Sequence, residues 1–315
     1  LISAPAGYGK TTLLSEWLTA SGQAAAWVSI DKGDNDPGRF WSYVIAALQD
    51  AFFSDSNSLS VIQASPALTP NETFITELIN ELDKLQQPLT LVLDDYHFIE
   101  TQAIHDGLSF LLEHAPLRFC LVISTRADPP LPLARLRARS DLLELRLADL
   151  IFTLQEAADF LNHTMGLKIS PEDIARITAR TEGWIAGLQI SALSMQKTDD
   201  ISGFITAFTG SHHYIFDYLL EEILGRQSSE IRHFLVYTSI LDQLSASLCD
   251  ALFDSELTRP SSVILEELDH SNLFIVPLDH EHRWYRYHSL FVELLRGYLQ
   301  QNNAGQIPIL HIRAS

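Results

Sequence analysis

The sequence predicts an α/β domain with a five-stranded parallel sheet over residues 1–150, followed by a helical region and a small domain of helices and one hairpin. Apolar runs without polar alternation predict the sheet, because parallel strands are covered on both faces. Helical patterns separate these runs, as in doubly wound folds. After about residue 150 the strand signal fades. Strands are expected at residues 1–3, 24–30, 89–93, 119–124 and 142–147, and helices at 10–19, 38–53, 72–85 and 102–114.

The first expected strand and helix are joined by Ala4-Pro-Ala-Gly-Tyr-Gly-Lys-Thr-Thr12, which has the spacing of a phosphate-binding loop. Gly7 and Gly9 let the backbone curl so that successive N–H groups point at one anion. Lys10 brings a positive charge to the β- and γ-phosphates, and the Thr11 hydroxyl is suited to ligate Mg²⁺. The helix directs its positive dipole end at the same place. The predicted nucleotide contacts are Ala4, Gly7, Tyr8, Gly9, Lys10, Thr11 and Thr12, with Ala4 standing where such loops usually begin with glycine.

An acidic pair, Asp94-Asp95, follows the apolar run at residues 89–93. Ligands of open α/β sheets bind at the carboxyl ends of the strands. Asp94 is expected to hold Mg²⁺, directly or through water, and Asp95 to orient or deprotonate an attacking water. A solvated acidic pair is the alternative for either residue alone, and the phosphate-binding loop argues against it.

The next expected strand, 119–124, ends in Ser124-Thr125-Arg126. One of these side chains is expected to face the γ-phosphate, and the Arg126 guanidinium would distinguish a triphosphate from a diphosphate. A surface arginine is the alternative. The basic cluster Arg135, Arg137 and Arg139 in a proline-bearing loop has no decided role, since arginines on an acidic protein also pair with nearby carboxylates.

The second half of the chain reads as helices with one hairpin. Thr153 and Glu156 form a capping box that opens a helix, residues 54–70 and 197–203 read as a surface loop and a linker, and residues 273–278 and 283–287 read as a hairpin. Helices followed by a hairpin indicate a winged helix. The expected domains are a nucleotide-binding domain at 1–150, a helical lid at 151–227, a winged helix at 228–300 and the start of a further helical domain at 301–315. Helices are expected at 153–162, 171–182, 185–195, 214–224, 228–239, 246–253, 261–270 and 289–299.

The charge pattern disfavours DNA reading by this winged helix. Residues 228–300 carry 11 acids, 5 arginines and no lysine, and the helix that would enter a groove carries Glu266, Glu267 and Asp269. Groove-reading helices normally present Arg, Lys, Asn or Gln to bases and phosphates. A regulatory lid or packing module is the favoured interpretation.

Composition sets broad limits. With 40 acids against 21 bases the net charge is −19, which disfavours non-specific nucleic-acid binding. Cys120 and Cys249 lie in apolar runs. This is typical of small buried side chains in a protein of a reducing compartment. No apolar run approaches the ~20 residues that span a bilayer. Because the chain begins at Leu1 inside an expected strand, we expect it to be a segment of a longer protein.

Taken together, the ordered motifs resemble the ATPase core of the large ATP-binding transcriptional regulators of the LuxR type, within the STAND class of P-loop ATPases. The resemblance covers essentially the whole chain. Besides the phosphate loop, it is carried by Asp31-Lys-Gly-Asp-Asn-Asp-Pro-Gly-Arg-Phe-Trp41, Leu93-Asp-Asp-Tyr-His97, Leu131-Pro-Leu-Ala-Arg-Leu-Arg-Ala-Arg139, Thr181-Glu-Gly-Trp-Ile-Ala-Gly-Leu188 and Tyr285-Arg-Tyr-His-Ser-Leu-Phe291.

The resemblance implies a cytoplasmic, signal-transducing ATPase that self-associates when ATP is bound. Its inducer would bind a helical-repeat sensor domain, and its DNA contacts would come from a terminal helix-turn-helix, both outside this chain. His288 would contact the β-phosphate of ADP, with an ordinary aromatic-cluster histidine as the alternative. The turn at residues 183–188 would approach the base or ribose, although it lacks the proline common there. Asp95 stands where many relatives carry Glu, which suits a slow switch.

Two other functions also fit the sequence. One is an ATP-dependent phosphotransferase acting on a small substrate, although little in the sequence supplies an acceptor site. The other is a non-hydrolysing scaffold with a vestigial site, suggested by Ala4 and by the short first strand.

Overall fold

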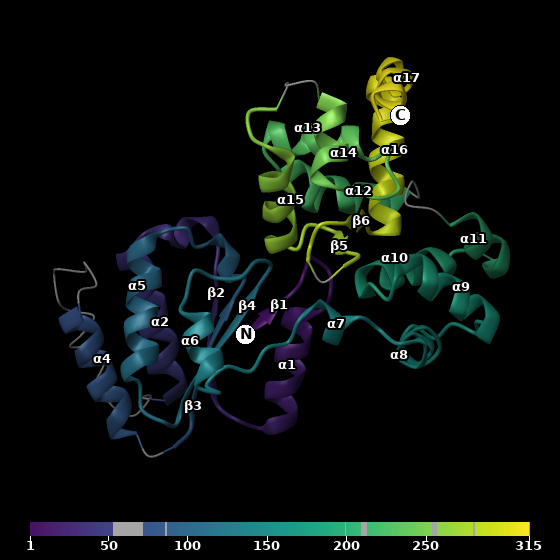
Figure 1. The fold of residues 1–315 in the computed structure, drawn as a ribbon. Helices are drawn as coiled ribbons and strands as arrows, with labels where there is room; N and C mark the ends of the chain where they lie inside the picture. The colour runs from purple at the N-terminus through teal and green to yellow at the C-terminus, as the bar shows by residue number, and fades with distance from the viewer. Residues whose placement is uncertain are drawn as a thin grey trace. The chain divides into compact units, whose positions relative to one another are not determined.

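The computed structural model describes residues 1–52, 72–85, 87–198, 200–208, 213–253, 257–279 and 281–314. The chain divides into two compact units (Figure 1). The first comprises Leu1–Ala4 and Gly9–Asp149, and the second comprises Pro5–Tyr8 and Leu150–Ser315. The middle of the predicted phosphate loop therefore packs with the second unit, and the residues on either side of it pack with the first. The predicted surface loop at residues 54–70 lies outside the described residues.

The first unit is built on a parallel sheet with strand order β1-β4-β3-β2. Every residue of the central strand β3 is buried, as its continuous apolar sequence predicts. The register pairs Ser3 of β1 with Thr125 of β4, and Ser29 of β2 with Asp94 of β3. The carboxyl ends of the four strands thus meet at one edge of the sheet. The strands are β1 (Ile2–Ser3), β2 (Ala25–Ser29), β3 (Leu89–Asp94) and β4 (Phe119–Thr125).

The prediction of a fifth strand at residues 142–147 is wrong. The described part of the sheet has four strands, and this segment contributes a single parallel bridge between Leu145 and Ile2. The Ser3 N–H donates to the Leu145 carbonyl at 3.0 Å, and the Leu145 N–H donates to the Leu1 carbonyl at 2.9 Å. Leu143 is exposed and Leu142 and Leu145 are only partly buried, in contrast to the continuously buried β3.

The helices of the first unit pack against this sheet. Helix α2 packs on β2, and α2, α4 and α5 lie together on one side of the sheet (Figure 1). Phe40 and Trp41 of α2 are fully buried in the core, with their rings edge to face at 5.4 Å. The helices are α1 (Lys10–Ser21), α2 (Pro37–Phe52), α4 (Glu72–Lys84), α5 (Gln102–His114), α6 (Leu133–Ala138) and α7 (Leu147–Leu150), with 3-10 turns η1 (Lys32–Asn35) and η2 (Tyr96–Phe98).

The second unit is helical apart from one hairpin. The capping box at Thr153 is confirmed, since the Thr153 N–H donates to Glu156 at 2.8 Å and the Glu156 N–H donates to the Thr153 hydroxyl at 3.3 Å. The predicted linker at 197–203 is partly helical, because α11 begins at Ile201 behind the N-cap Asp200. The first elements are α8 (Leu154–Asp159), the π turn η3 (Phe160–Thr164), α9 (Pro171–Thr181), α10 (Ile185–Met195), α11 (Ile201–Ala207), α12 (His213–Glu222) and η4 (Leu224–Arg226).

The rest of the second unit has winged-helix architecture, with three helices, an antiparallel hairpin and a closing helix. A buried hydrogen bond of 2.7 Å between the Tyr287 and Thr238 hydroxyls fastens the hairpin to α13. None of the described helices is long and apolar enough to cross a membrane. The elements are α13 (Ser229–Thr238), α14 (Ala246–Phe253), α15 (Ser261–His270), β5 (Ile275–Pro277), β6 (Tyr285–Tyr287), α16 (Ser289–Asn303), η5 (Ala304–Gln306) and α17 (Ile307–Arg313).

Candidate functional site: a phosphate loop and its two sets of partners

Lys10 is the first residue of α1 and lies almost completely buried at the end of the sheet. It follows Gly9, whose φ of 76° is left-handed. The Lys10 ammonium donates to the Ala4 carbonyl at 2.9 Å. Burial, together with the nearby Arg126, lowers the pKa of Lys10 to about 8 against the opposing effect of Asp95 and Asp94. A buried ammonium held by a neutral carbonyl is suited to exchange that partner for an anion.

Thr11 and Asp94 meet at the same edge of the sheet. The Thr11 hydroxyl donates to Asp94 Oδ2 at 2.9 Å, and the Asp95 N–H donates to Asp94 Oδ1 at 3.1 Å. A hydroxyl and a carboxylate fit Mg²⁺, which takes one or two protein ligands and completes its shell with waters and phosphates. Among the described residues no group of three or more His, Cys, Asp or Glu could hold a metal ion by itself. This donor set therefore suits a cation that arrives with a phosphorylated ligand.

Asp95 adopts a left-handed backbone conformation, with φ of 58°. Aspartate adopts this conformation more readily than most non-glycine residues, and such conformations also cluster at functional sites. The Asp95 carboxylate is partly exposed, and His97 Nδ1 lies 3.7 Å from its Oδ1. The backbone thus separates the two acids, leaving Asp94 buried against Thr11 and turning Asp95 toward solvent.

The end of β4 supplies the remaining polar groups of the first unit. Ser124 and Thr125 are fully buried, and Arg126 is partly buried and close enough to Lys10 to lower its pKa. Thr125 Oγ1 donates to the Ala127 carbonyl at 2.6 Å, so this hydroxyl stabilises the turn. The Ser124 hydroxyl has no hydrogen-bond partner among the described residues. Because buried hydroxyls are normally hydrogen-bonded, the Ser124 hydroxyl is available to bind a ligand at this edge of the sheet.

The motif at residues 31–41 has a structural role that sequence reasoning missed. The Asn35 amide donates to the Phe98 carbonyl at 2.6 Å, and its oxygen accepts from the N–H groups of Glu100 at 2.7 Å and Thr101 at 3.2 Å. Asn35 therefore fixes the segment that follows Asp95. The sequence signal was an asparagine within a turn-forming run, but nothing local indicated its distant partners.

The middle of the phosphate loop belongs to the second unit. The Trp184 indole N–H donates to the Ala6 carbonyl at 3.0 Å, and the Ala186 backbone N–H donates to the Gly7 carbonyl at 3.0 Å. Gly7 has φ of 76°, and a Cβ there would lie 2.7 Å from both the Ala186 Cβ and the Trp184 Nε1. Position 7 therefore requires glycine both for its backbone conformation and for the space between Trp184 and Ala186.

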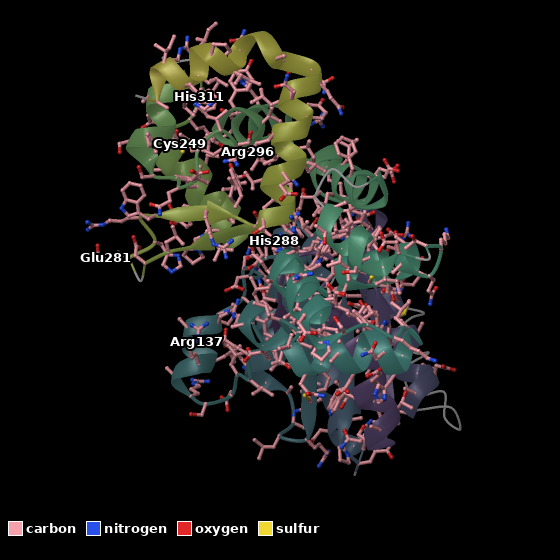
Figure 2. All side chains as sticks on the ribbon, turned by 90° about the vertical axis from the view of Figure 1, so that its right-hand side faces the viewer. Arg137, Cys249, Glu281, His288, Arg296 and His311 are labelled. Atoms are coloured by element: carbon pink, nitrogen blue, oxygen red, sulfur yellow. The ribbon has the colours of Figure 1, made fainter. Side chains whose placement is uncertain are left out.

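His288 lies at the N-cap of α16 and is 3% exposed (Figure 2). Its Nδ1 accepts from the Leu290 N–H at 3.3 Å, so the ring proton sits on Nε2, which donates to the Thr181 carbonyl at 3.0 Å. Burial lowers the pKa of His288, so the imidazole is neutral at neutral pH. Its ring packs edge to face with Trp184 and Phe274. Both ring nitrogens are thus engaged within the second unit.

Glu182 is the charged partner of this region. Arg286 of β6 donates two hydrogen bonds to the carboxylate, at 2.9 Å and 2.8 Å, and the Ser289 N–H at the start of α16 donates a third at 2.9 Å. Burial opposes ionisation, but the bonds from Arg286 and Ser289 outweigh it and hold the pKa of Glu182 at about 2. Glu182 and Arg286 lie in two of the motifs found in the sequence, but nothing in those motifs indicates that the two residues pair.

The arginine cluster lies on a short helix, α6, rather than in a loop. Pro132 is tolerated just before its first turn. Arg135 forms an ion pair with Glu113, and Arg137 forms two hydrogen bonds with Glu144 at 2.7 Å and 2.9 Å. Arg139 is exposed. For Arg135 and Arg137 the structure therefore favours the interpretation of arginines that pair with an acidic surface.

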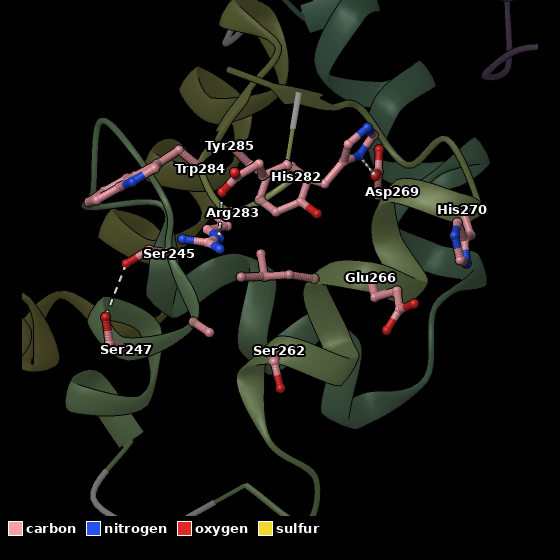
Figure 3. A pocket seen from close by; sticks show the side chains of 13 residues that line it. Ser245, Ser247, Ser262, Glu266, Asp269, His270, His282, Arg283, Trp284 and Tyr285 are labelled. Carbon is pink, nitrogen blue, oxygen red and sulfur yellow. Dashed lines mark hydrogen bonds and ion pairs between the residues drawn. The ribbon is translucent and has the colours of Figure 1, made fainter. Parts of the chain in front are cut away.

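A hollow of about 800 Å³ lies on the winged-helix domain between α14, α15 and the hairpin (Figure 3). Glu266 and Asp269 of α15 face it, and the side chain of His282 contacts Asp269 at 2.5 Å. Arg283, which also lines it, pairs with Glu281 at 2.9 Å. His282 and Arg283 are thus next to carboxylates on a face to which α15 contributes Glu266 and Asp269.

Comparison with known proteins finds similarity to MalT over the whole chain. A family model described as the MalT winged helix domain matches residues 220–307. The HTH-type transcriptional regulator MalT of Klebsiella pneumoniae is 35% identical over all of this chain, and that of Yersinia enterocolitica is 34% identical over all of it. The chain is similar to these MalT proteins over its whole length. It spans about a third (35%) of the length of these MalT proteins.

A solved structure shows the fold of the MalT-like segment independently. The Walker-type ATPase of Pyrococcus abyssi superposes with a TM-score of 0.60 over 94% of this chain and 90% of that one, at 16% identity. The MalT-like segment therefore has a P-loop ATPase fold followed by a winged helix. The predicted site residues fall in two sets: Ala4, Gly9, Lys10, Thr11, Thr12, Asp94, Asp95 and Arg126 in the first unit, and Gly7, Tyr8 and His288 in the second. Thr12 is exposed on α1.

Proposed function

We propose that this chain is the nucleotide-binding core of a MalT-like transcriptional regulator, which binds ATP or ADP together with Mg²⁺ and hydrolyses ATP slowly. The observation that carries the proposal is the group formed by Lys10, Thr11 and Asp94. It combines a buried ammonium, a hydroxyl and a carboxylate at the carboxyl end of the sheet. This is where α/β sheets bind ligands, and these groups match phosphates and a hard cation.

In the proposed site each residue has a defined task. Lys10 leaves the Ala4 carbonyl and binds the β- and γ-phosphates. Thr11 and Asp94 would hold Mg²⁺, which when bound neutralises phosphate charge. Asp95, turned away from Asp94 by its left-handed backbone, orients the attacking water or accepts its proton. Ser124, whose hydroxyl has no partner among the described residues, and Arg126 face the γ-phosphate.

The nucleotide is proposed to act as a switch through the winged helix. His288 is neutral and has one N–H, on Nε2. A contact with the β-phosphate of ADP would therefore replace its bond to the Thr181 carbonyl. ADP would thus engage Lys10, Thr11 and His288 and favour a closed state. ATP with an inducer would favour an open state that self-associates, a population shift driven by differential affinity.

The other partners follow from the same proposal. The relatives are named HTH-type transcriptional regulators, whereas α15 here is acidic on the face that lines the hollow. DNA binding is therefore assigned to a helix-turn-helix elsewhere in the regulator. The inducer is assigned to a sensor domain outside this chain, and the site of action to the cytoplasm.

The first test is the nucleotide that the purified protein carries. The protein is denatured and the released nucleotide is identified by chromatography, and the binding of added ADP and ATP with Mg²⁺ is measured by calorimetry. Near-stoichiometric ADP supports a closed switch. Rapid phosphoryl transfer to a small molecule would favour a phosphotransferase instead. A protein that carries no nucleotide and binds neither ATP nor ADP would be a scaffold, and the proposal would fail.

A further inference from the structure

Two successive carbonyls of the phosphate loop, those of Ala6 and Gly7, accept hydrogen bonds from the N-cap and the first turn of α10. The donors are the Trp184 indole and the Ala186 backbone. Both bonds measure 3.0 Å, and the first is buried and joins residues 178 positions apart. This turn is thus a structural neighbour of the loop, and neither donor is explained by the chemistry proposed above.

Because of peptide geometry, each bond to a loop carbonyl also fixes the direction of the next N–H. In a trans peptide the C=O of one residue and the N–H of the next share a plane and point in opposite directions. A donor that holds the Ala6 carbonyl therefore also fixes the direction of the Gly7 N–H. In the same way, the bond from Ala186 to the Gly7 carbonyl fixes the direction of the Tyr8 N–H. In a phosphate loop, these N–H groups are the ones that bind the anion.

Trp184 is held rigidly enough to act in this way. Its side chain is fully buried. Its ring packs against Phe274 and His288 of the winged-helix region at centroid distances of 5.4 Å and 6.1 Å, and against Tyr218 of α12 at 5.6 Å. The indole therefore has one available orientation, with its N–H toward the loop. Trp184 thus contacts both the winged-helix region, through Phe274 and His288, and the phosphate loop, through Ala6.

We propose that Trp184 is a positioning residue for the phosphate loop: its indole N–H, with the Ala186 N–H, turns the amides of Gly7 and Tyr8 toward the phosphates of the bound nucleotide. The inference rests on the proposed function, because it concerns how well the loop binds that nucleotide. It adds a residue of the helical region to the determinants of nucleotide affinity.

The test replaces Trp184 by Phe, which keeps an aromatic ring in the cluster and removes the N–H. Since one hydrogen bond to the loop is lost, ADP affinity should fall about ten-fold, and KM for ATP should rise by a similar factor with kcat changed less than about two-fold. Trp284→Phe, at an exposed tryptophan of the hairpin, is the matched control. A lower melting temperature with parental ADP affinity would give Trp184 a merely structural role and overturn the inference.

A measurement on the unaltered protein guards against misfolding of the variant. Ala186 is the second residue of α10, where an amide has no partner within its own helix. Bonded to the loop, its amide should exchange with deuterium at least about ten-fold more slowly than that of Glu230, at the same position of α13. Equal protection of the two amides would overturn the inference.

The two proposals fail in distinguishable ways. If the parent protein binds ADP, Lys10→Ala does not, and Trp184→Phe binds like the parent, then the nucleotide site stands and the role of Trp184 is refuted. If the parent protein binds no nucleotide, both proposals are refuted.

Discussion

In the first unit, Lys10 and Thr11 form hydrogen bonds with groups that a nucleotide and its cation would replace, the Ala4 carbonyl and the Asp94 carboxylate. In the second unit, the Glu182 carboxylate is bonded to Arg286 and Ser289, which belong to the fold itself. The first arrangement is suited to exchange partners, and the second to hold two elements together. Substitutions in the first unit should therefore alter binding with little loss of stability, and those at Glu182 should do the reverse.

The largest effect is expected from Lys10→Ala. Removing the ammonium leaves the phosphates without their buried positive partner, at a cost of about 4 kcal/mol, or roughly a thousand-fold in ADP affinity. Calorimetry with ADP measures it, and Lys84→Ala, at an exposed lysine of α4 paired with Glu81, is the control. An ADP affinity unchanged from the parent would remove Lys10 from the site.

Asp95→Asn should separate hydrolysis from binding. If Asp95 orients the water or accepts its proton, the ATPase rate should fall about 100-fold, and ADP affinity should change less than about two-fold. Phosphate release under saturating ATP measures the rate, with Asp141→Asn, at an exposed residue of the same unit, as control. A parental rate would assign the reaction to another group.

Glu182→Gln should destabilise the second unit by about 2 kcal/mol, since Arg286 and the start of α16 lose a charged acceptor. The pH dependence has a definite sign. The pKa of Glu182 is held at about 2, below its ordinary 4.5, so its contribution is complete above pH 4.5 and is lost as the pH falls toward 2. Urea unfolding of both proteins across this range measures the difference, and Glu221→Gln on exposed α12 surface is the control. A difference that does not shrink on acidification would contradict the assignment.

The smallest effect is expected from His288→Ala, which should weaken ADP binding about ten-fold and ATP binding less, because one hydrogen bond is lost only in the closed state. Competition binding with the two nucleotides measures the ratio. His270→Ala, at an exposed histidine of α15, is the control. Equal losses for ADP and ATP would make His288 a structural residue of its aromatic cluster.

Local spacing predicts much of this molecule. The phosphate loop, the acids after β3 and the longer helices of both units follow from patterns within a few residues, whereas the short helices α6 and α11 were expected to be a loop and part of a linker. The number of strands did not follow from such patterns, because residues 142–147 have the leucines of a strand but make a single bridge, between Leu145 and Ile2. The bonds from Trp184 to Ala6, from Arg286 to Glu182 and from Asn35 to Phe98 join residues 178, 104 and 63 positions apart, and no local pattern reports such pairs.

The bond between Trp184 and Ala6 also has a consequence for synthesis of the chain. The loop is made early, and its donor follows 178 residues later. At about 5–20 residues per second, roughly ten to forty seconds separate the two. During this interval the ribosome holds a nascent chain whose phosphate loop has no indole partner. If the Trp184 bond orients the loop as proposed, a newly made chain is expected to bind nucleotide with full affinity only after α10 has emerged.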